Sequence, residues 1–199
     1  INNQATNNGG GIYRDDDGSV DIINCTIAFN SASSNGGGIA TSSNDTIKNS
    51  IIYFNTANQS NNNIHGSPNP VITYSNLQGG YSPEGEGNID ADPLFVDPTN
   101  EDYHLNASSP CIDTGDPEFP LDPDGTRADM GAYYFDQTDV NIVNVTPDSL
   151  DFSTDLDTLS MTIRYVGIGD FSWNITDAPD WLTFNPSESG RGEKYQDVG

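Results

Sequence analysis

A repeat of about 25 residues is the feature that most limits what this chain can fold into. The segment Asn8-Gly9-Gly10-Gly11-Ile12 recurs as Asn35-Gly36-Gly37-Gly38-Ile39. Further columns keep a step of 25 residues: Ile22, Ile47 and Ile72; Cys25, Ser50 and Ser75; Ile27, Ile52 and Leu77; Phe29, Phe54 and Gly79; Asn30, Asn55 and Gly80. Repeats of roughly 20–50 residues are typical of solenoids, propellers and other arrays.

Within each repeat the apolar and small residues alternate. Cys25, Ile27 and Phe29 are spaced by two, which predicts short strands, and Gly, Asn and Ser separate these strands without any helical pattern. Several short strands per repeat predict one coil of a parallel β-helix. Equivalent side chains would then lie about 4.8 Å apart, so the Ile, Phe and small polar columns should form interior ladders. Asn30 and Asn55 should form an amide ladder at a turn, where Asn tolerates positive φ and bonds local backbone.

Residues 1 to about 90 resemble the repeats of the right-handed parallel β-helix superfamily, which includes pectate lyases and many surface adhesins. We therefore expect an all-β fold with about 3–4 coils of ~25 residues. We expect coils over 1–82, an irregular acidic capping module over 83–137, and part of an immunoglobulin-like β-sandwich over 138–199.

The chain is strongly acidic. It holds 30 Asp and Glu residues against six Lys and Arg, a formal net charge of −24. Such a charge repels phosphate and anionic lipid headgroups, which excludes nucleic acid and membrane surfaces as partners, and it favours divalent cations. No apolar run approaches the ~18–20 residues needed to span a bilayer, so membrane insertion is not expected. We expect a fragment of a longer polypeptide in which Cys25 and Cys111 do not form a disulfide.

The segment after the repeats is rich in Asp and Pro, and it closely resembles the choice-of-anchor Q module that ends many secreted bacterial β-helix proteins. The matching residues are Asp90, Asp92, Pro93, Leu94, Phe95, Tyr103, His104, Leu105, Ser109, Pro110, Ile112, Asp113, Gly115, Asp124, Gly125, Arg127, Asp129, Gly131, Ala132 and Tyr133. An open β-helix end exposes unpaired strand edges, so we expect this module to cover the end of the coils. His104, between two apolar neighbours, is expected to pack within it.

One loop of this module has two interpretations. Asp122, Asp124 and Asp129 surround Gly125, and alternating carboxylates around a glycine turn can bind Ca²⁺. The same residues also fit an Asp-Gly turn, with Arg127 paired to Asp113 or Asp129.

The last third of the chain predicts antiparallel strands. Apolar residues alternate over 159–165 and 171–175, and further strands are expected over 145–152 and 178–186. Residues 145–190 resemble a BACON domain, a family proposed to bind carbohydrate or mucin, through the sequence motifs V-x-P-x-S-L-x-F and A-P-x-W-L. We expect an incomplete sandwich here, because such a fold needs about seven strands. Trp173 and Trp181, with Tyr13 in the first repeat, are the candidate sugar-binding residues, although core packing also explains both tryptophans.

No catalytic residues are predicted. The coils contain only Arg14 and Lys48 as bases, and no nucleophile–base pair or metal-spaced Cys/His set is present. We expect a non-catalytic part of a large secreted or cell-surface bacterial protein, serving as a stalk or adhesin with carbohydrate contact. The alternative is the C-terminal part of a β-helix polysaccharide lyase or glycosidase whose active site lies upstream.

Overall fold

The computed structural model divides the chain into two compact units, Ile1–Phe135 and Asp136–Gly199, which are described separately. It describes residues 1–15, 18–41, 45–59, 62–66, 70–80 and 85–138, followed by the strand residues 141–146, 161–167, 171–174, 189–192 and 195–198. Within these ranges the regular structure is all β, apart from one 3₁₀ turn at Pro98–Asn100.

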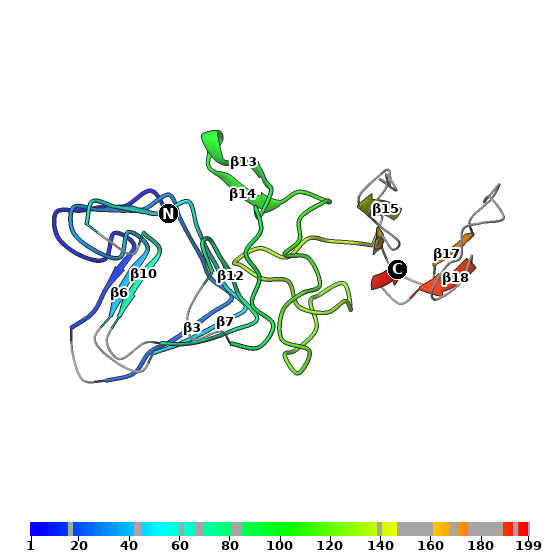
Figure 1. Cartoon of the computed structure of the whole chain (residues 1–199), viewed down its shortest axis with the longest axis horizontal. Helices are drawn as coiled ribbons and strands as arrows, with labels where there is room; N and C mark the ends of the chain where they lie inside the picture. Colours follow the sequence, from blue (N-terminus) through cyan, green and yellow to red (C-terminus); the bar gives the residue numbers. More distant parts are fainter. Residues whose placement is uncertain are drawn as a thin grey trace, which may run out of the picture. The chain divides into compact units, whose positions relative to one another are not determined.

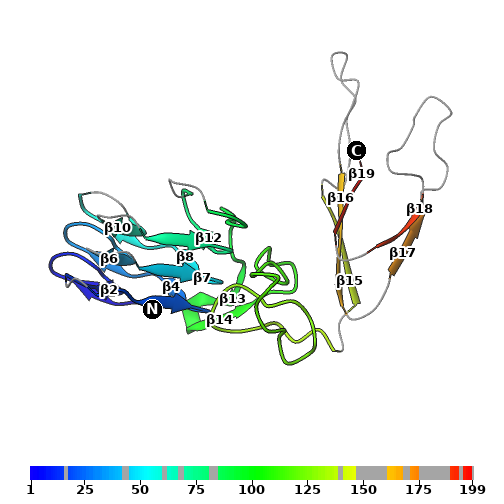
Figure 2. The same cartoon turned by 90° about the horizontal axis from the view of Figure 1, so that it is seen from below.

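The first unit is a parallel β-helix, as the sequence predicts. Its short strands stack in four parallel sheets of three strands: β1-β5-β9, β2-β6-β10, β3-β7-β11 and β4-β8-β12. The bounds are β1 Gln4–Ala5, β2 Ile12–Tyr13, β3 Asp21–Ile23, β4 Thr26–Ala28, β5 Ser31–Ala32, β6 Ile39–Thr41, β7 Thr46–Lys48, β8 Ile51–Tyr53, β9 Thr56–Ala57, β10 Ile64–Gly66, β11 Val71–Thr73 and β12 Asn76–Leu77. Successive coils nearly superimpose in Figure 1 and lie one above another in Figure 2.

The predicted register of the coils is confirmed. Ile47 pairs with Ile22 on one side and with Ile72 on the other, so the three side chains form one column. Because parallel strands in register place equivalent side chains over one another, aliphatic columns fill the interior. The buried core consists of Ile22, Ile27, Ile39, Ile47, Ile52, Ile64, Ile72 and Leu77.

The corners between strands use the left-handed region of backbone conformation. Asn24, Asn49 and Tyr74 have φ values of 49°, 48° and 47° at one corner, and Phe29 and Phe54 have 57° and 56° at the next. Each is followed by a small or amide residue that contacts the neighbouring coil. A single residue of this conformation reverses the chain direction sharply, which lets a two-residue corner join two strands.

The asparagine ladder forms as predicted, and the residues with positive φ at this turn are the ones that precede its members. Asn30 donates from both its backbone N and its Nδ2 to Oδ1 of Asn55, each at 3.0 Å. Nδ2 of Asn55 donates to the carbonyl oxygen of Ile27 at 2.8 Å. The left-handed residues are the preceding Phe29 and Phe54. The amides therefore connect one coil to the next, while the phenylalanines form the corner itself.

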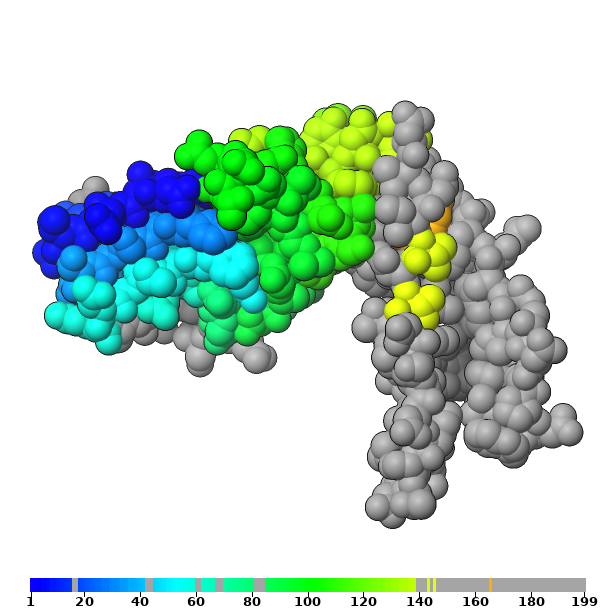
Figure 3. All heavy atoms as spheres, turned by 90° about the horizontal axis from the view of Figure 1, so that it is seen from above, coloured from blue at the N-terminus to red at the C-terminus, as the bar shows by residue number. Residues whose placement is uncertain are grey.

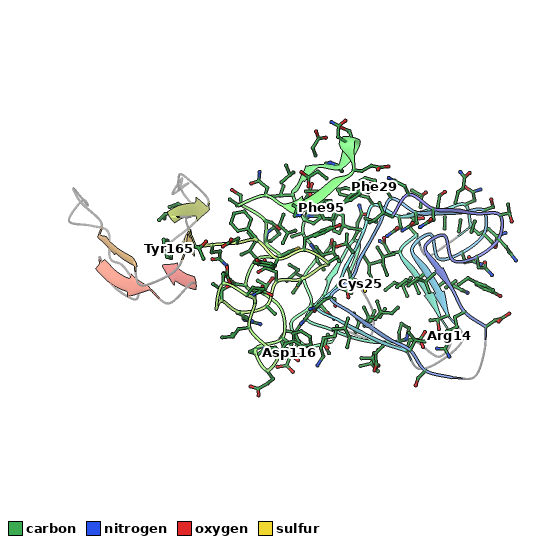
Figure 4. All side chains as sticks on the ribbon, turned by 180° about the vertical axis from the view of Figure 1, so that it is seen from behind. Arg14, Cys25, Phe29, Phe95, Asp116 and Tyr165 are labelled. Carbon is green, nitrogen blue, oxygen red and sulfur yellow. The ribbon has the colours of Figure 1, made fainter. Side chains whose placement is uncertain are left out.

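The phenylalanine column is not part of the aliphatic interior, which corrects the expectation of an interior Phe ladder. The rings of Phe29 and Phe54 stack with their centroids 4.9 Å apart. Phe95 and Tyr103, from the segment after the coils, pack against Phe29 at 6.5 and 5.9 Å. Figure 4 shows Phe29 and Phe95 close together at this corner. A positive φ at the corner interrupts the strand alternation, so these rings leave the interior.

The segment after the coils continues the stack briefly. Ile89 bridges to Asn76, and its backbone N donates to the carbonyl oxygen of Ser75 at 3.0 Å. The backbone N of Leu77 in turn donates to the carbonyl oxygen of Ile89 at 2.9 Å. The segment therefore begins with part of one further, irregular coil.

The remainder of this segment lies along the side of the coils rather than across their end (Figures 1 and 3). The N–H of Ala132 donates to Oγ1 of Thr26 in the first coil, at 3.0 Å. The N–H of Gly131 donates to the carbonyl oxygen of Asn49 in the second coil, at 2.8 Å. Nδ2 of Asn76 in the third coil contacts Sγ of Cys111 at 3.1 Å. A segment that contacts three successive coils must run along the stack, so the expected cover over the end is instead a lateral cover.

This lateral cover buries apolar residues that point away from the interior of the coils. Ile51, on the outward side of β8, is fully buried, and so is Ala28 of β4. The cover includes the antiparallel hairpin β13 (Phe95–Asp97) and β14 (Asp102–Leu105). Cys25 and Cys111 do not form a disulfide, as predicted.

The second unit contains antiparallel strands. β15 (Asn141–Thr146), β16 (Met161–Gly167) and β19 (Tyr195–Val198) form one sheet, and β17 (Phe171–Asn174) pairs with β18 (Ser189–Gly192). β16 and β17 coincide with the two strands predicted from alternation, whereas β15 begins several residues earlier than expected. The strand predicted over 178–186 lies outside the described residues.

Candidate functional site

The bases of the first unit decide which ligands this unit can attract. Arg14 pairs with the buried carboxylate of Asp45. Nζ of Lys48 lies 2.7 Å from Oδ2 of Asp116, and this contact keeps the pKa of Asp116 below its ordinary value. Both bases therefore neutralise carboxylates of their own unit.

Arg127 is the third base of this unit. Its Nε donates to the carbonyl oxygen of Gly115 at 2.6 Å, and its guanidinium lies 5.9 Å from the ring centroid of Tyr74. The pairing with Asp113 or Asp129 that the turn interpretation expects is wrong, because the guanidinium binds backbone carbonyls instead. All three bases between residues 1 and 135 are thus engaged internally.

The acidic loop is arranged around backbone donors. Oδ2 of Asp122 accepts from the N–H of Asp129 at 2.8 Å. Oδ1 of Asp124 accepts from both the N–H and the hydroxyl of Thr126, at 3.0 and 2.7 Å. Gly125 has a φ of 84°, a conformation that favours glycine. The loop is therefore the Asp-Gly turn that the sequence offers as one of two interpretations.

Asp129 connects three parts of the lateral cover. Its Oδ1 accepts from the N–H of Asp113 at 2.6 Å, and its Oδ2 accepts from the N–H of Phe135 at 2.7 Å. The pKa of Asp129 is raised to about 7, chiefly by burial; the two N–H donors oppose this rise, and the charges of Asp122 and Asp113 add to it. The carboxyl group is thus a structural acceptor that titrates near neutral pH.

Metal binding is not evident in the part of the chain that the structure describes. There, no three His, Cys, Asp or Glu side chains gather in an arrangement that would hold a metal ion. Asp122, Asp124 and Asp129 direct carboxylate oxygens to backbone N–H groups, as given above. Calcium binding by these three residues remains a prediction of the sequence.

Of the predicted sugar-binding side chains, that of Tyr13 lies within the described part of the chain. Tyr13 lies on β2 with 54% of its surface exposed, and its hydroxyl donates to Oδ2 of Asp15 at 3.3 Å. The negative charge of Asp15 is the main cause that raises the pKa of Tyr13. The side chain of Trp173, on β17, and the whole of Trp181 lie outside the described residues.

A site that sequence reasoning missed lies on the β13–β14 hairpin. The ring of His104 is stacked against Tyr133, with the centroids 4.3 Å apart and the planes tilted by 35°. The His104 side chain is 60% exposed, so the predicted packing of this residue within the module is wrong. The signal was present in the sequence, because a strand that buries Tyr103 and Leu105 must direct the residue between them outwards.

Comparisons of the chain with family models, curated proteins and solved structures found no match. Among the described residues no helix has the length and apolar character needed to cross a membrane. Fold and chemistry therefore define the class: an acidic parallel β-helix with a lateral cover, followed by an antiparallel β unit.

Proposed function

We propose that the chain is a non-catalytic structural part of a large secreted or cell-surface bacterial protein, a stalk or adhesin that contacts carbohydrate. The observation that carries this proposal is the internal use of Arg14, Lys48 and Arg127. A lyase acting on an acidic polysaccharide needs a base to remove a proton and positive charge to offset the substrate. In the described coils, Arg14 and Lys48 are instead paired with Asp45 and Asp116.

The architecture supports the same proposal. Four parallel sheets stack strand upon strand, and successive coils contribute the same residue columns. Solenoids of this kind present extended surfaces that suit polymers and neighbouring cells. The excess of carboxylates would keep such a surface soluble and apart from anionic polymers.

The modular assignment belongs to this proposal. On the residues quoted above, 1–82 would be coils of the pectate-lyase-like superfamily, 83–137 a choice-of-anchor Q type module, and 138–199 part of a BACON-like domain. Antiparallel strands β15, β16 and β19 agree with a sandwich-type unit in the last part.

An assay for product formation tests the proposal. The chain is incubated with polygalacturonate, alginate and neutral glycans, and products are followed by absorbance of unsaturated uronates and by reducing ends. We expect no product from any substrate. Cleavage by this chain would overturn the proposal, and cleavage only by a longer polypeptide with further coils would favour the lyase or glycosidase alternative.

A further inference from the structure

The outward face of the β13–β14 hairpin carries an exposed aromatic pair that the fold does not need. Phe95, Tyr103 and Leu105 point inwards, where Phe95 and Tyr103 contact each other at 5.7 Å. Val96 and His104 alternate with them and are exposed, Val96 by 52%. Tyr133 is 46% exposed although it stacks on His104. The inner residues of the hairpin are therefore packed, whereas its outer residues are exposed to water.

The ring of His104 is held in a fixed orientation. Asp102 Oδ1 lies 2.7 Å from Nδ1 of His104 and also accepts from the His104 backbone N–H at 3.1 Å. These hydrogen bonds keep the pKa of Asp102 below its ordinary value, so the carboxylate is ionised. Because Nδ1 is used, the second ring nitrogen, Nε2, points away from Asp102 and is available to a ligand.

We propose that this face, formed by the stacked rings of His104 and Tyr133, binds a neutral sugar residue of a glycan. This inference rests on the proposed function in one respect, namely that the chain contacts carbohydrate without cleaving it. The C–H groups of a pyranose can pack on the aromatic surface, while its hydroxyls exchange hydrogen bonds with Nε2 of His104 and the Tyr133 hydroxyl. A fixed ring lowers the entropy cost of binding.

The charges near this face select among ligands. Asp97 and Asp102 on the hairpin, with Glu101 between them, repel uronates and sulfated sugars. The carboxylate of Asp102 already binds His104. The polar atoms left for a ligand are Nε2 of His104 and the hydroxyl of Tyr133, which match sugar hydroxyls.

Binding is tested on the full chain by NMR and calorimetry with cellohexaose, laminarihexaose and mannohexaose as neutral probes. Trigalacturonate is the anionic probe and tetralysine the cationic one. The chain has two histidines, so the imidazole signals of His104 are assigned by comparison with His104→Ala. We expect at least one neutral hexasaccharide to shift these signals, and Tyr133→Ala and His104→Ala each to weaken its binding about tenfold.

Val71→Ala is the control, because Val71 is an exposed apolar residue that lies on β11 in another sheet. Its affinity for the sugar should equal that of the unmodified chain. All three substituted residues are exposed, so an unchanged melting temperature shows that the fold is intact. Binding that survives Tyr133→Ala, that is lost in Val71→Ala alone, or that occurs only with trigalacturonate or tetralysine would overturn the inference.

Absence of binding by all three neutral probes would also overturn it. These outcomes are distinct from failure of the proposed function, which is decided by product formation. A sugar that binds at His104 and is cleaved would overturn the non-catalytic proposal and leave the binding face in place.

Discussion

The amide ladder offers the sharpest test of how the coils are held together. Asn55 is buried, and its side chain makes four hydrogen bonds: it accepts from the backbone N and Nδ2 of Asn30, and it donates to the Ile27 carbonyl and to Oδ1 of Asn63. Asn55→Ala removes all four at once and leaves their partners inside the fold. The change therefore acts on the contact between coils and leaves the aliphatic core intact.

The magnitude follows from these four bonds. A buried group left without its hydrogen bond costs about 1–3 kcal/mol, and water entering the site recovers part of that cost. For the partners of Asn55 we expect a loss of about 3–5 kcal/mol in the free energy of unfolding of the first unit. For a unit of this size such a loss lowers the melting temperature by about 10 °C.

Urea unfolding followed by circular dichroism, with calorimetry for the melting temperature, measures this loss. Asn58→Ala is the control, because Asn58 is exposed, and it should change stability by less than about 0.5 kcal/mol. Asn55→Asp keeps the acceptor for Asn30 but buries a charge, so its stability should rise as the pH falls and the carboxyl group becomes protonated. If Asn55→Ala loses less than about 1 kcal/mol, or no more than Asn58→Ala, the coils are not held by this ladder.

Three further outcomes follow from the structure. Because the pKa of Asp129 is raised to about 7 in the folded chain, against 3.8 as the ordinary value, folding takes up a proton between about pH 4 and 7, and stability falls as the pH rises through that range. Calorimetry at pH 5 and pH 8 should show this fall in the unmodified chain and a smaller one in Asp129→Asn; equal falls would contradict the assignment. A Cβ on Gly37 would lie 2.1 Å from the carbonyl oxygen of Thr56, so Gly37→Ala should prevent stacking of the coils, whereas Gly79→Ala, with open space around it, should cost only about 1–2 kcal/mol for its left-handed backbone. Calcium should leave the melting temperature unchanged. Asp124→Ala should lower the free energy of unfolding by about 1 kcal/mol, because the hydrogen bonds to Thr126 are lost. A rise of the melting temperature with calcium that Asp124→Ala abolishes would instead establish the metal site.

The coils were predictable because the same pattern of apolar and small polar residues recurs in each repeat. Ile22, Ile47 and Ile72 fall in one column only if every coil has the same length, so three repeats fix the register together. The corners were harder. Phe29 has a positive φ that is uncommon for an aromatic residue, and nothing in the alternation distinguishes it from a strand residue.

The lateral position of the segment after the coils could not be derived from its own residues. A segment without repeats has no residues in register with the coils, so its sequence does not show where it packs. Its apolar residues could cover the end of the coils or their side equally well. The informative signal lay in the coils: β8 reads Ile51-Ile52-Tyr53, apolar on both faces, and such strands are buried on both sides. His104 was missed for a related reason, because its neighbours suggested packing while their inward direction required it to face water.

The lateral cover changes how such a rod would respond to force and heat. In a solenoid each coil contacts only its neighbours, so terminal coils can detach one at a time. Here residues of the lateral cover contact Thr26, Asn49 and Asn76, which belong to three successive coils. Detaching a single coil would require breaking its contacts to the lateral cover, which also binds the other coils. We therefore expect the first unit to unfold in one cooperative transition rather than one coil at a time.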